Sequence, residues 1–329
     1  MAGKLIKVLF TGGSGAATIE AVKALKARGE YEVVTADALR NSAGFTFADR
    51  SYVVPWGVDD DFERVLAEIV DREHPDYIVP LVDEEIPKVH AFVRSRESGT
   101  KVVAPAPSFC NLVLDKWTMA RALAEHQLPV AATWLASDAG AATYPAIVKP
   151  RQGRGSRGLA FIDRPADLSA YLATAPKPND QYIVQERLIG PEFTTSAVVG
   201  LDNTFLTAVP KEAVEKRGIT QVGVTRSVRE IDQLCRDITR DLKPCGPYNV
   251  QLILGSDRVP RVIEINPRYS TTMALTIASG VDEVDAVLRH DRGLDPGRLT
   301  FEPDLMMLRY TAQIYVKERD WHPIDLRQR

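Results

Sequence analysis

The sequence predicts an α/β protein whose C-terminal half is of the α+β type. Short apolar runs alternate with helical stretches over residues 5–105, which is typical of parallel βαβ units. Residues 145–162 run as strand, glycine-rich loop and strand. Residues 249–268 form two apolar runs around a six-residue turn, which indicates an antiparallel hairpin.

Composition limits the class of protein. The chain has 329 residues, enough for two or three domains, and a net charge of −3, which excludes a globally basic surface for nucleic acid. No apolar run approaches the ~18 residues that span a bilayer, and the start, MAGKLIKVLF, lacks signal-peptide features. The three cysteines lack CxxC spacing and indicate reduced thiols. We therefore expect a cytoplasmic protein that binds neither nucleic acid nor membrane.

The first hundred residues predict a parallel sheet with interleaved helices. Asp59 is expected to cap the second helix. The predicted strands are 5–10, 31–37, 51–55, 77–83 and 99–105, and the predicted helices are 17–28 and 60–74.

The stretch TGGSGAAT joins the first strand to the first helix. With Asp37 about 20 residues on, it invites a dinucleotide-binding interpretation, but the glycine spacing is not GxGxxG. A tight turn uses the same residues, and anion binding at the helix N-terminus is an alternative. Asp83, Glu84 and Glu85 end a later strand; they are expected to cap the next helix, with contact to a substrate as the alternative.

The middle of the chain begins at the proline-rich segment 104–109, a candidate boundary. A helix follows at 115–127, and strands at 145–149 and 159–163 enclose the loop RQGRGSRG. This loop lacks the P-loop pattern, yet its glycines and Arg151, Arg154 and Arg157 suit a cover over a polyphosphate. A plain surface hairpin is the alternative.

The C-terminal half predicts a meander of strands and amphipathic helices. A strand, a break at 189–191 and a second strand fill 181–199, and a further strand follows from 201. Helices are predicted at 229–246, 271–282 and 284–290, a strand pair or long strand at 304–318, and nothing definite at 319–329.

The hairpin at 249–268 carries the clearest chemistry. If it is symmetric about Asp257 and Arg258, Gln251 lies opposite Glu264, and Asn266 shares their face. The other face would pair Val250 with Ile265 and Leu252 with Ile263. A carboxylate and two amides suit Mg²⁺ held together with substrate phosphates. An ordinary amphipathic hairpin with a solvated face is the alternative.

These segments together resemble the ATP-grasp superfamily, most closely the single-copy branch similar to the large subunit of carbamoyl-phosphate synthase. The most specific matches are NVQLIL followed by VIEINPR, with DK, VKP, the glycine loop and VQERLIGPE in support. The resemblance implies a pre-ATP-grasp domain at 1–106, a small lobe with the glycine-rich loop at 107–184 and a C-terminal lobe with the metal-binding hairpin at 185–329.

The resemblance also implies roles for individual residues. Lys116 and Lys149 would contact ATP phosphates, and Arg268 would stabilise the transferring phosphoryl group. Lys211, Arg217 and Arg226 fall in a segment that reaches the carboxylate substrate in the family, with solvated cations as the alternative. The remaining nucleotide-binding residues would be Gly153, Gly155, Ser156, Gln185, Glu186, Leu188 and Glu192. Gln251, Glu264 and Asn266 would hold Mg²⁺, with Mn²⁺ as an alternative metal; many family members carry a carboxylate where Gln251 stands.

The implied activity is that of an ATP-dependent carboxylate–amine ligase. An acyl-phosphate intermediate would be attacked by an amine to give an amide or peptide bond, ADP and phosphate. The carboxylate could be an amino acid, and the family suggests a homodimer. The alternatives are a carbamoyl-phosphate-type phosphorylation of bicarbonate and a nucleotide-binding module without turnover.

Overall fold

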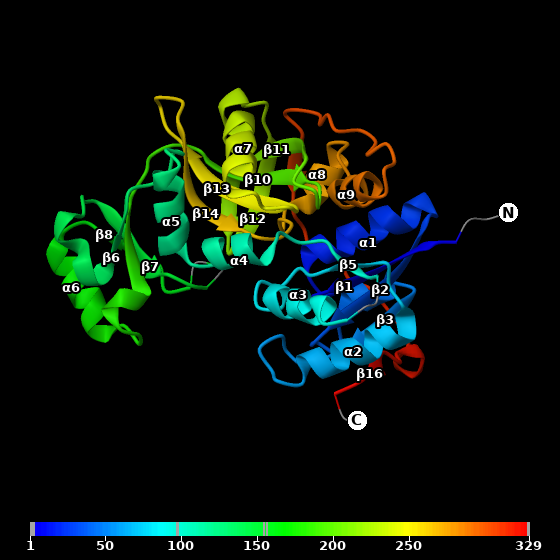
Figure 1. The fold of residues 1–329 in the computed structure, drawn as a ribbon. Coiled ribbons are helices and arrows are strands. Elements are labelled where there is room, and N and C mark those ends of the chain that lie inside the picture. Colours follow the sequence, from blue (N-terminus) through cyan, green and yellow to red (C-terminus); the bar gives the residue numbers. More distant parts are fainter. Residues whose placement is uncertain (1–3, 97–98, 154, 156, 328–329) are drawn as a thin grey trace.

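The computed structural model describes residues 4–96, 99–153, 155 and 157–327. The chain forms three sheets with helices packed on them (Figure 1). A parallel sheet contains both ends of the described chain, a small antiparallel sheet lies at the opposite side of the molecule, and a large antiparallel sheet lies between them.

The N-terminal sheet is parallel throughout, with the order β16-β3-β2-β1-β4-β5. All five predicted strands are present, although the last two are shorter than predicted. The strands are β1 (Ile6–Thr11), β2 (Tyr31–Asp37), β3 (Arg50–Val53), β4 (Tyr77–Val79), β5 (Lys101–Val102) and β16 (Ile324–Asp325). The helices are α1 (Ala16–Arg28), α2 (Phe62–Glu73) and α3 (Ile86–Arg94), with a 3₁₀ turn at Ala43–Thr46.

The turn between β1 and α1 is built by local hydrogen bonds. Gly12 has a φ of 69°, a left-handed conformation that glycine adopts at low cost. The Asp37 carboxylate accepts hydrogen bonds from the backbone N–H groups of Ser14 (2.6 Å) and Leu39 (2.7 Å). The side chain that a dinucleotide site would place on a ribose is thus committed to the turn, which supports the structural interpretation.

The predicted cap of α2 is wrong by two residues. Asp61, not Asp59, stands at the N-cap, and Asp59 Oδ2 accepts a hydrogen bond from the Trp56 N–H (3.0 Å). Three acidic residues in a row, Asp59 to Asp61, leave the sequence without a signal for which one begins the helix.

The middle of the chain forms two helices and the small sheet, whose order is β6-β9-β7-β8. The Asp115 carboxylate accepts hydrogen bonds from the N–H groups of Trp117 and Thr118 and thereby caps the predicted helix. The helices are α4 (Pro107–Val113), α5 (Lys116–Glu125) and α6 (Pro165–Thr174), and the strands are β6 (Thr133–Leu135), β7 (Ala146–Pro150), β8 (Ala160–Ile162) and β9 (Tyr182–Glu186). Two 3₁₀ segments lie at Ala136–Ala141 and Asn179–Gln181.

The large sheet has the order β14-β13-β10-β11-β12-β15 and carries α7 on one face (Figure 1). Its strands are β10 (Glu192–Val199), β11 (Phe205–Arg217), β12 (Ile219–Thr225), β13 (Tyr248–Leu254), β14 (Pro260–Asn266) and β15 (Met306–Leu308). The helices are α7 (Arg229–Leu242), α8 (Met273–Ala278) and α9 (Glu283–Asp291), and a 3₁₀ turn lies at Glu318–Asp320. The predicted mixture of parallel and antiparallel sheets is confirmed.

The end of the chain differs from the prediction. Of the apolar stretch 304–318, only Met306–Leu308 pairs, at the edge of the large sheet beside β12. The chain then crosses to the first sheet, where β16 pairs with β3 in the segment that the sequence left unassigned. Residues 324–327 therefore pack on the N-terminal sheet and not with the rest of 185–329; the boundaries at 106 and 184 stay predictions.

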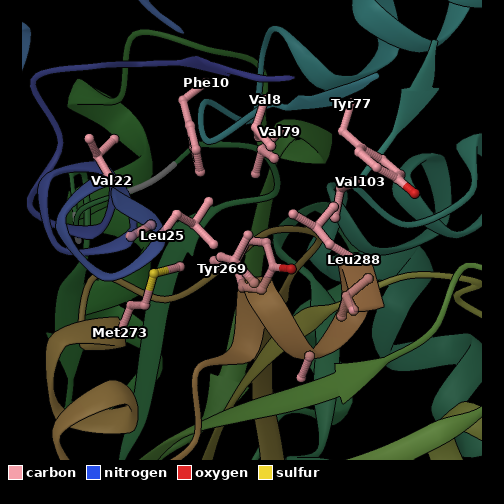
Figure 2. Close-up of a cluster of buried hydrophobic side chains, with 14 of the residues drawn as sticks. Val8, Phe10, Val22, Leu25, Tyr77, Val79, Val103, Tyr269, Met273 and Leu288 are labelled. Atoms are coloured by element: carbon pink, nitrogen blue, oxygen red, sulfur yellow. The ribbon is translucent and has the colours of Figure 1, made fainter. Parts of the chain in front are cut away.

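A hydrophobic core joins the first sheet to the large one. Val8, Phe10 and Val22 pack in the same cluster as Tyr269 and Met273, which follow the hairpin (Figure 2). This shared packing holds the N-terminal sheet against the C-terminal lobe, so the two meet at a fixed surface. Within the described part of the chain, no helix is long and apolar enough to cross a membrane.

Candidate functional site

The hairpin β13/β14 brings the three predicted metal ligands to one side. Gln251 pairs with Glu264 and Val250 with Ile265, so the predicted register is confirmed at these positions. The predicted pair of Leu252 with Ile263 is wrong, because a β-bulge makes Leu252 face Val262. A bulge leaves its extra residue outside the ladder. Ile263 is that residue, and the bulge leaves Ile263 and Glu264 lining one cavity.

Lys149 uses the backbone group that the bulge sets free. It lies in β7, is buried, and donates a hydrogen bond from Nζ to the carbonyl oxygen of Ile263 (3.3 Å). Burial lowers the pKa of Lys149 to about 8, while the nearby Glu264 carboxylate opposes that change. A desolvated cation in this position gains most from an anionic ligand.

Lys116 approaches the same carboxylate from the first turn of α5. Its Nζ donates to the carbonyl oxygen of Gly153 (2.8 Å) and lies 3.5 Å from Glu264 Oε1. Two buried lysines thus surround one carboxylate.

A cavity of about 360 Å³ lies between the small sheet and the hairpin. Among its described lining residues, five side chains are cationic (Lys116, Lys149, Arg157, Arg187 and Lys216) and three are carboxylates (Glu186, Glu192 and Glu264). The cavity therefore favours an anion. The predicted site residues that line it are Lys116, Lys149, Gly153, Gly155, Gln185, Glu186, Leu188, Glu192, Gln251 and Glu264.

The glycine-rich loop borders this cavity through Gly153, Gly155 and Arg157. Ser156 and Arg154 lie outside the described residues. Arg151 does not face the cavity as the sequence suggested; it pairs with Asp115 (2.7 Å) and donates to the Asp180 carbonyl oxygen. Arg151 therefore ties the base of the loop to the start of α5.

The far end of the cavity lies where β9 leads into β10. Gln185 is buried and donates from Nε2 to the Thr133 hydroxyl (3.1 Å), and Glu186 accepts from the Ala132 N–H (3.3 Å). Glu192 pairs with Lys216 at 2.5 Å. Residues 187–191, between β9 and β10, form no helix, so their backbone N–H and C=O groups are not used in helical hydrogen bonds.

Several lining residues were not predicted from the sequence. Lys216 lies on β11 and reaches the cavity through its ion pair with Glu192. Arg187 stacks over the Phe161 ring at 4.8 Å, and both line the cavity near Leu188. The only sequence signal for Lys216 is its place in a charged strand end, which does not distinguish it from its neighbours.

Arg268 borders an adjoining cavity of about 350 Å³. Its guanidinium pairs with Asp83, which follows β4 of the N-terminal sheet (Nε to Oδ1, 2.7 Å). Of the three residues expected to cap the next helix, Glu85 stands at the N-cap position, without a side-chain capping hydrogen bond. For Asp83 the expectation is wrong, because its carboxylate pairs with Arg268. Besides the charged side chains of Arg157, Glu192, Lys216 and Glu264, the cavity is lined by uncharged polar ones: Thr194, Thr220, Asn249, Gln251, Asn266, Ser270 and Thr271.

Lys211 does not reach a substrate cavity. It is fully buried, and its Nζ donates to the hydroxyls of Ser196 and Thr276, both at 2.6 Å. Burial lowers the pKa of Lys211, and Glu283 beside it opposes the change. Arg217 pairs with Glu215 at the surface, and Arg226 pairs with Glu212 and Asp304. The three cations thus have structural partners.

The donor set of the hairpin fits Mg²⁺ bound together with phosphates. Among the residues that the structure describes, no three His, Cys, Asp or Glu side chains gather as a metal site. Mg²⁺ commonly uses only one or two protein carboxylates, plus waters and substrate phosphates. Glu264 supplies the carboxylate. The amides of Gln251 and Asn266 make no side-chain hydrogen bonds within the described chain, although Asn266 is only 7% exposed.

Comparison with known proteins agrees with this architecture. Residues 113–272 match the family described as the ATP-grasp domain, and residues 8–103 match the PylC-like N-terminal domain. The fold and the site define a class of mixed α/β protein that binds an anionic ligand in a cavity between the small sheet and the hairpin of the large sheet. The chain therefore contains an ATP-grasp domain, preceded by a PylC-like N-terminal domain.

Solved structures share the fold at low sequence identity. The ADP complex of N5-carboxyaminoimidazole synthetase from Staphylococcus aureus matches with a TM-score of 0.70 and 16% identity over 93% of this chain and 81% of that chain. A second match is the biotin carboxylase domain of the Hydrogenobacter thermophilus 2-oxoglutarate carboxylase, solved with MgADP and bicarbonate. Its TM-score is 0.69, with 16% identity over 89% of this chain and 71% of that chain. L-amino acid ligase from Bacillus licheniformis matches with a TM-score of 0.65 and 16% identity over 87% of this chain and 74% of that chain.

Proposed function

We propose that the protein is an ATP-dependent carboxylate–amine ligase. It would phosphorylate a carboxylate with ATP and join the acyl group to an amine, releasing ADP and phosphate. The observation that carries this proposal is the position of Glu264, which lines both the cation-rich cavity and the cavity that contains Arg268. A phosphoryl donor in the first cavity and an acceptor in the second would meet at this carboxylate.

The cation-rich cavity suits the nucleotide. Lys116 and Lys149 would neutralise phosphate charge, and the glycines at 153 and 155 would let backbone N–H groups approach closely. The edge formed by Gln185, Glu186 and Leu188 would hold the adenine, and Glu192 the ribose hydroxyls. Ser156 belongs to the same proposed set by its place in the loop sequence.

Gln251, Glu264 and Asn266 would hold Mg²⁺, with Mn²⁺ as an alternative. The metal would neutralise charge on the phosphates. These three side chains would fix its place between the cavities, since they lie on adjacent hairpin strands.

Arg268 would stabilise the acceptor carboxylate and the acyl-phosphate. Asp83 holds the guanidinium in one orientation, so little side-chain entropy remains to be lost when a substrate binds. Water exclusion by the glycine-rich loop would protect the acyl-phosphate from hydrolysis.

The type of ligation receives support from the fold relatives. One of them is an L-amino acid ligase, and another is a carboxyaminoimidazole synthetase. The polar lining around Arg268 suits a small carboxylate such as an amino acid.

The proposal is tested by screening substrates for ADP formation. The protein is incubated with MgATP and panels of amino acids, small carboxylic acids and bicarbonate, with and without primary amines. We expect ADP release that requires Mg²⁺ and one class of carboxylate, with an amide product visible by mass spectrometry. ADP release at the same rate with and without every carboxylate would contradict a ligase.

A further inference from the structure

A third cavity, of about 230 Å³, lies where the N-terminal sheet meets α4, α5 and the hairpin. It opens beside Asp83 and Glu84, which follow the carboxyl end of β4. In parallel sheets this edge is the usual place for ligands. Gly153, Lys116 and Glu264 also line the proposed nucleotide cavity, so the two spaces are neighbours.

The charge of this cavity is opposite to that of the nucleotide cavity. Asp83, Glu84 and Glu264 line it with three carboxylates, and Lys116 is the single cation among its described lining residues. Lys116 is engaged by Glu264 and by the carbonyl oxygen of Gly153, and Arg268 pairs with Asp83 from the adjoining cavity, so among the described residues at this junction three carboxylates face two cations. A cationic group is therefore favoured here, while a second anion is disfavoured.

The remaining wall of the cavity has an apolar part beside Gly153 and the polar side chains of Gln152 and Asn266. Pro87, Val113, Leu114 and Ile265 supply the apolar part. The volume is below the ~300–1,000 Å³ of drug-sized ligand sites. A compact molecule with a short apolar side chain and one cationic head fits these surfaces.

The ion pair between Arg268 and Asp83 links this cavity to the proposed acyl site. Arg268 lines the cavity of about 350 Å³, and Asp83 lines the cavity of about 230 Å³. Arg268 thus lines the cavity proposed for the carboxylate substrate, and Asp83 lines the cavity of about 230 Å³. Glu264 and the buried Asn266 line both.

We propose that the cavity of about 230 Å³ binds the amine substrate, a compact primary amine in its ammonium form with a short apolar side chain. This assignment rests on the proposed ligase function. Asp83 and Glu84 attract the ammonium group, and Leu114 and Pro87 contact the side chain. The amine then enters from the side of the N-terminal sheet, separate from the carboxylate.

The step at this junction balances as RCO–OPO₃²⁻ + R′NH₃⁺ → RCO–NHR′ + HPO₄²⁻ + H⁺. The amine nitrogen loses a proton to expose its lone pair and forms the C–N bond. The C–O bond to phosphate breaks, and the phosphate leaves with the bonding electrons. Of the two protons that nitrogen releases, one ends on phosphate and one in solvent.

The test compares two nucleophiles on one acyl-phosphate. Hydroxylamine is small and uncharged at neutral pH, so its hydroxamate product reports acyl-phosphate formation without needing an ammonium site. Methylamine, isobutylamine and the L-amino acids serve as the amine panel. Each is measured with the wild type, Leu114→Trp and Glu84→Gln, using Leu294→Trp and Glu63→Gln as matched controls at exposed positions away from the three cavities.

Leu114→Trp fills the cavity, so amide formation should fall by about tenfold or more relative to hydroxamate formation. Glu84→Gln removes one negative charge at an exposed position, and the KM for the amine should rise roughly threefold.

Two outcomes would overturn the amine site. In the first, both variants form hydroxamate and keep the KM of the wild type for the amine; this result would leave the ligase function in place. In the second, the variants lose hydroxamate and amide formation equally, which would place the defect in acyl-phosphate formation and not in amine binding. A wild type that forms no hydroxamate with any carboxylate would refute the ligase function itself.

Discussion

At the scale of single residues, Glu264 is the point where the three cavities meet. It is the carboxylate of the proposed metal ligands and the partner of Lys116. Its neighbour across the hairpin, Gln251, is neutral, and hard cations bind neutral oxygens less strongly than carboxylates. The two positions should therefore respond differently to substitution.

We expect Glu264→Gln to lower kcat by about a hundredfold or more and to raise the Mg²⁺ concentration needed for half-maximal rate. Gln251→Ala should cost about tenfold or less. Metal titrations of ADP formation measure both effects. Full activity of Glu264→Gln at low Mg²⁺ would contradict the assignment.

The buried Lys149 predicts a pH dependence of nucleotide affinity. With a pKa of about 8, its ammonium is present below that pH and is lost above it. Because phosphate binds the charged form, the affinity for ADP without added metal should weaken by up to about tenfold per pH unit above pH 8. Lys149→Arg keeps its charge at these pH values and should flatten the profile. Calorimetric titrations between pH 6.5 and 9.5 provide the check; an unchanged slope in the arginine variant would count against this role.

The same shift affects the stability of the free protein, and the sign follows from proton binding. Between pH 8 and the ordinary value of 10.5, the unfolded Lys149 binds a proton that the folded form has released. Stability contributed by this group therefore rises with pH across that window.

The sequence predicts which residues lie together where both belong to one hairpin. The spacing of Gln251 and Glu264 follows from two-residue alternation and a short turn. The pairing of Arg268 with Asp83 joins residues that are 185 positions apart, and no local pattern encodes it. Lys216 was missed for the same reason, because its partner Glu192 lies on another strand.

At the scale of elements, periodicity predicted most helices and strands, and the errors fall where tertiary contacts decide. The bulge at Ile263 cannot be read from alternation alone, since it shifts the register of the remaining strand by one residue. The apolar stretch 304–318 reads as a strand, but the structure pairs only Met306–Leu308. Its remaining residues lack a neighbouring strand within the described chain.

Helix α7 packs on one face of the large sheet, which includes the hairpin strands β13 and β14. Ile238 is fully buried against this sheet, whereas Gln233 on the same helix is exposed. Ile238→Ala should lower the free energy of unfolding by about 2–5 kcal/mol, and Gln233→Ala by less than about 0.5 kcal/mol. Urea denaturation followed by circular dichroism would measure both. Similar costs for the two variants would show that this face does not pack as described.

The glycine-rich loop should serve catalysis more than folding. Deleting residues 153–158 removes loop backbone, since the flanking strands β7 and β8 end at Pro150 and begin at Ala160. We expect a thermal midpoint within a few degrees of the wild type but a fall in product formed per ADP released, because water would reach the acyl-phosphate. An unchanged ratio of product to ADP would exclude the proposed cover.

At the scale of the whole molecule, the site depends on contact between parts that are distant in sequence. The N-terminal sheet supplies Asp83, the middle of the chain supplies both lysines, and the hairpin supplies the proposed metal ligands. The core shared by Phe10, Tyr269 and Met273 fixes these parts against each other (Figure 2). The sequence predicted the three parts and their order but not this junction.

The C-terminal segment is the clearest case of long-range order. Leu326 is fully buried in the core of the N-terminal sheet, beside Tyr52 and Phe62. Leu326→Ala should cost about 2–5 kcal/mol of stability, while Leu39→Ala, at an exposed position just after β2 of the same sheet, should cost far less. Chemical denaturation of the two variants distinguishes them. Equal stability would mean that the end of the chain does not hold the first sheet.

The proposal of an acyl-phosphate ligase is tested most directly by following oxygen atoms. The active carboxylate, labelled with ¹⁸O in its carboxyl group, is supplied with MgATP and the amine, and the released phosphate is examined by mass spectrometry. Phosphoryl transfer to the carboxylate predicts one ¹⁸O atom in phosphate for each amide formed. Unlabelled phosphate accompanying full amide formation would contradict it.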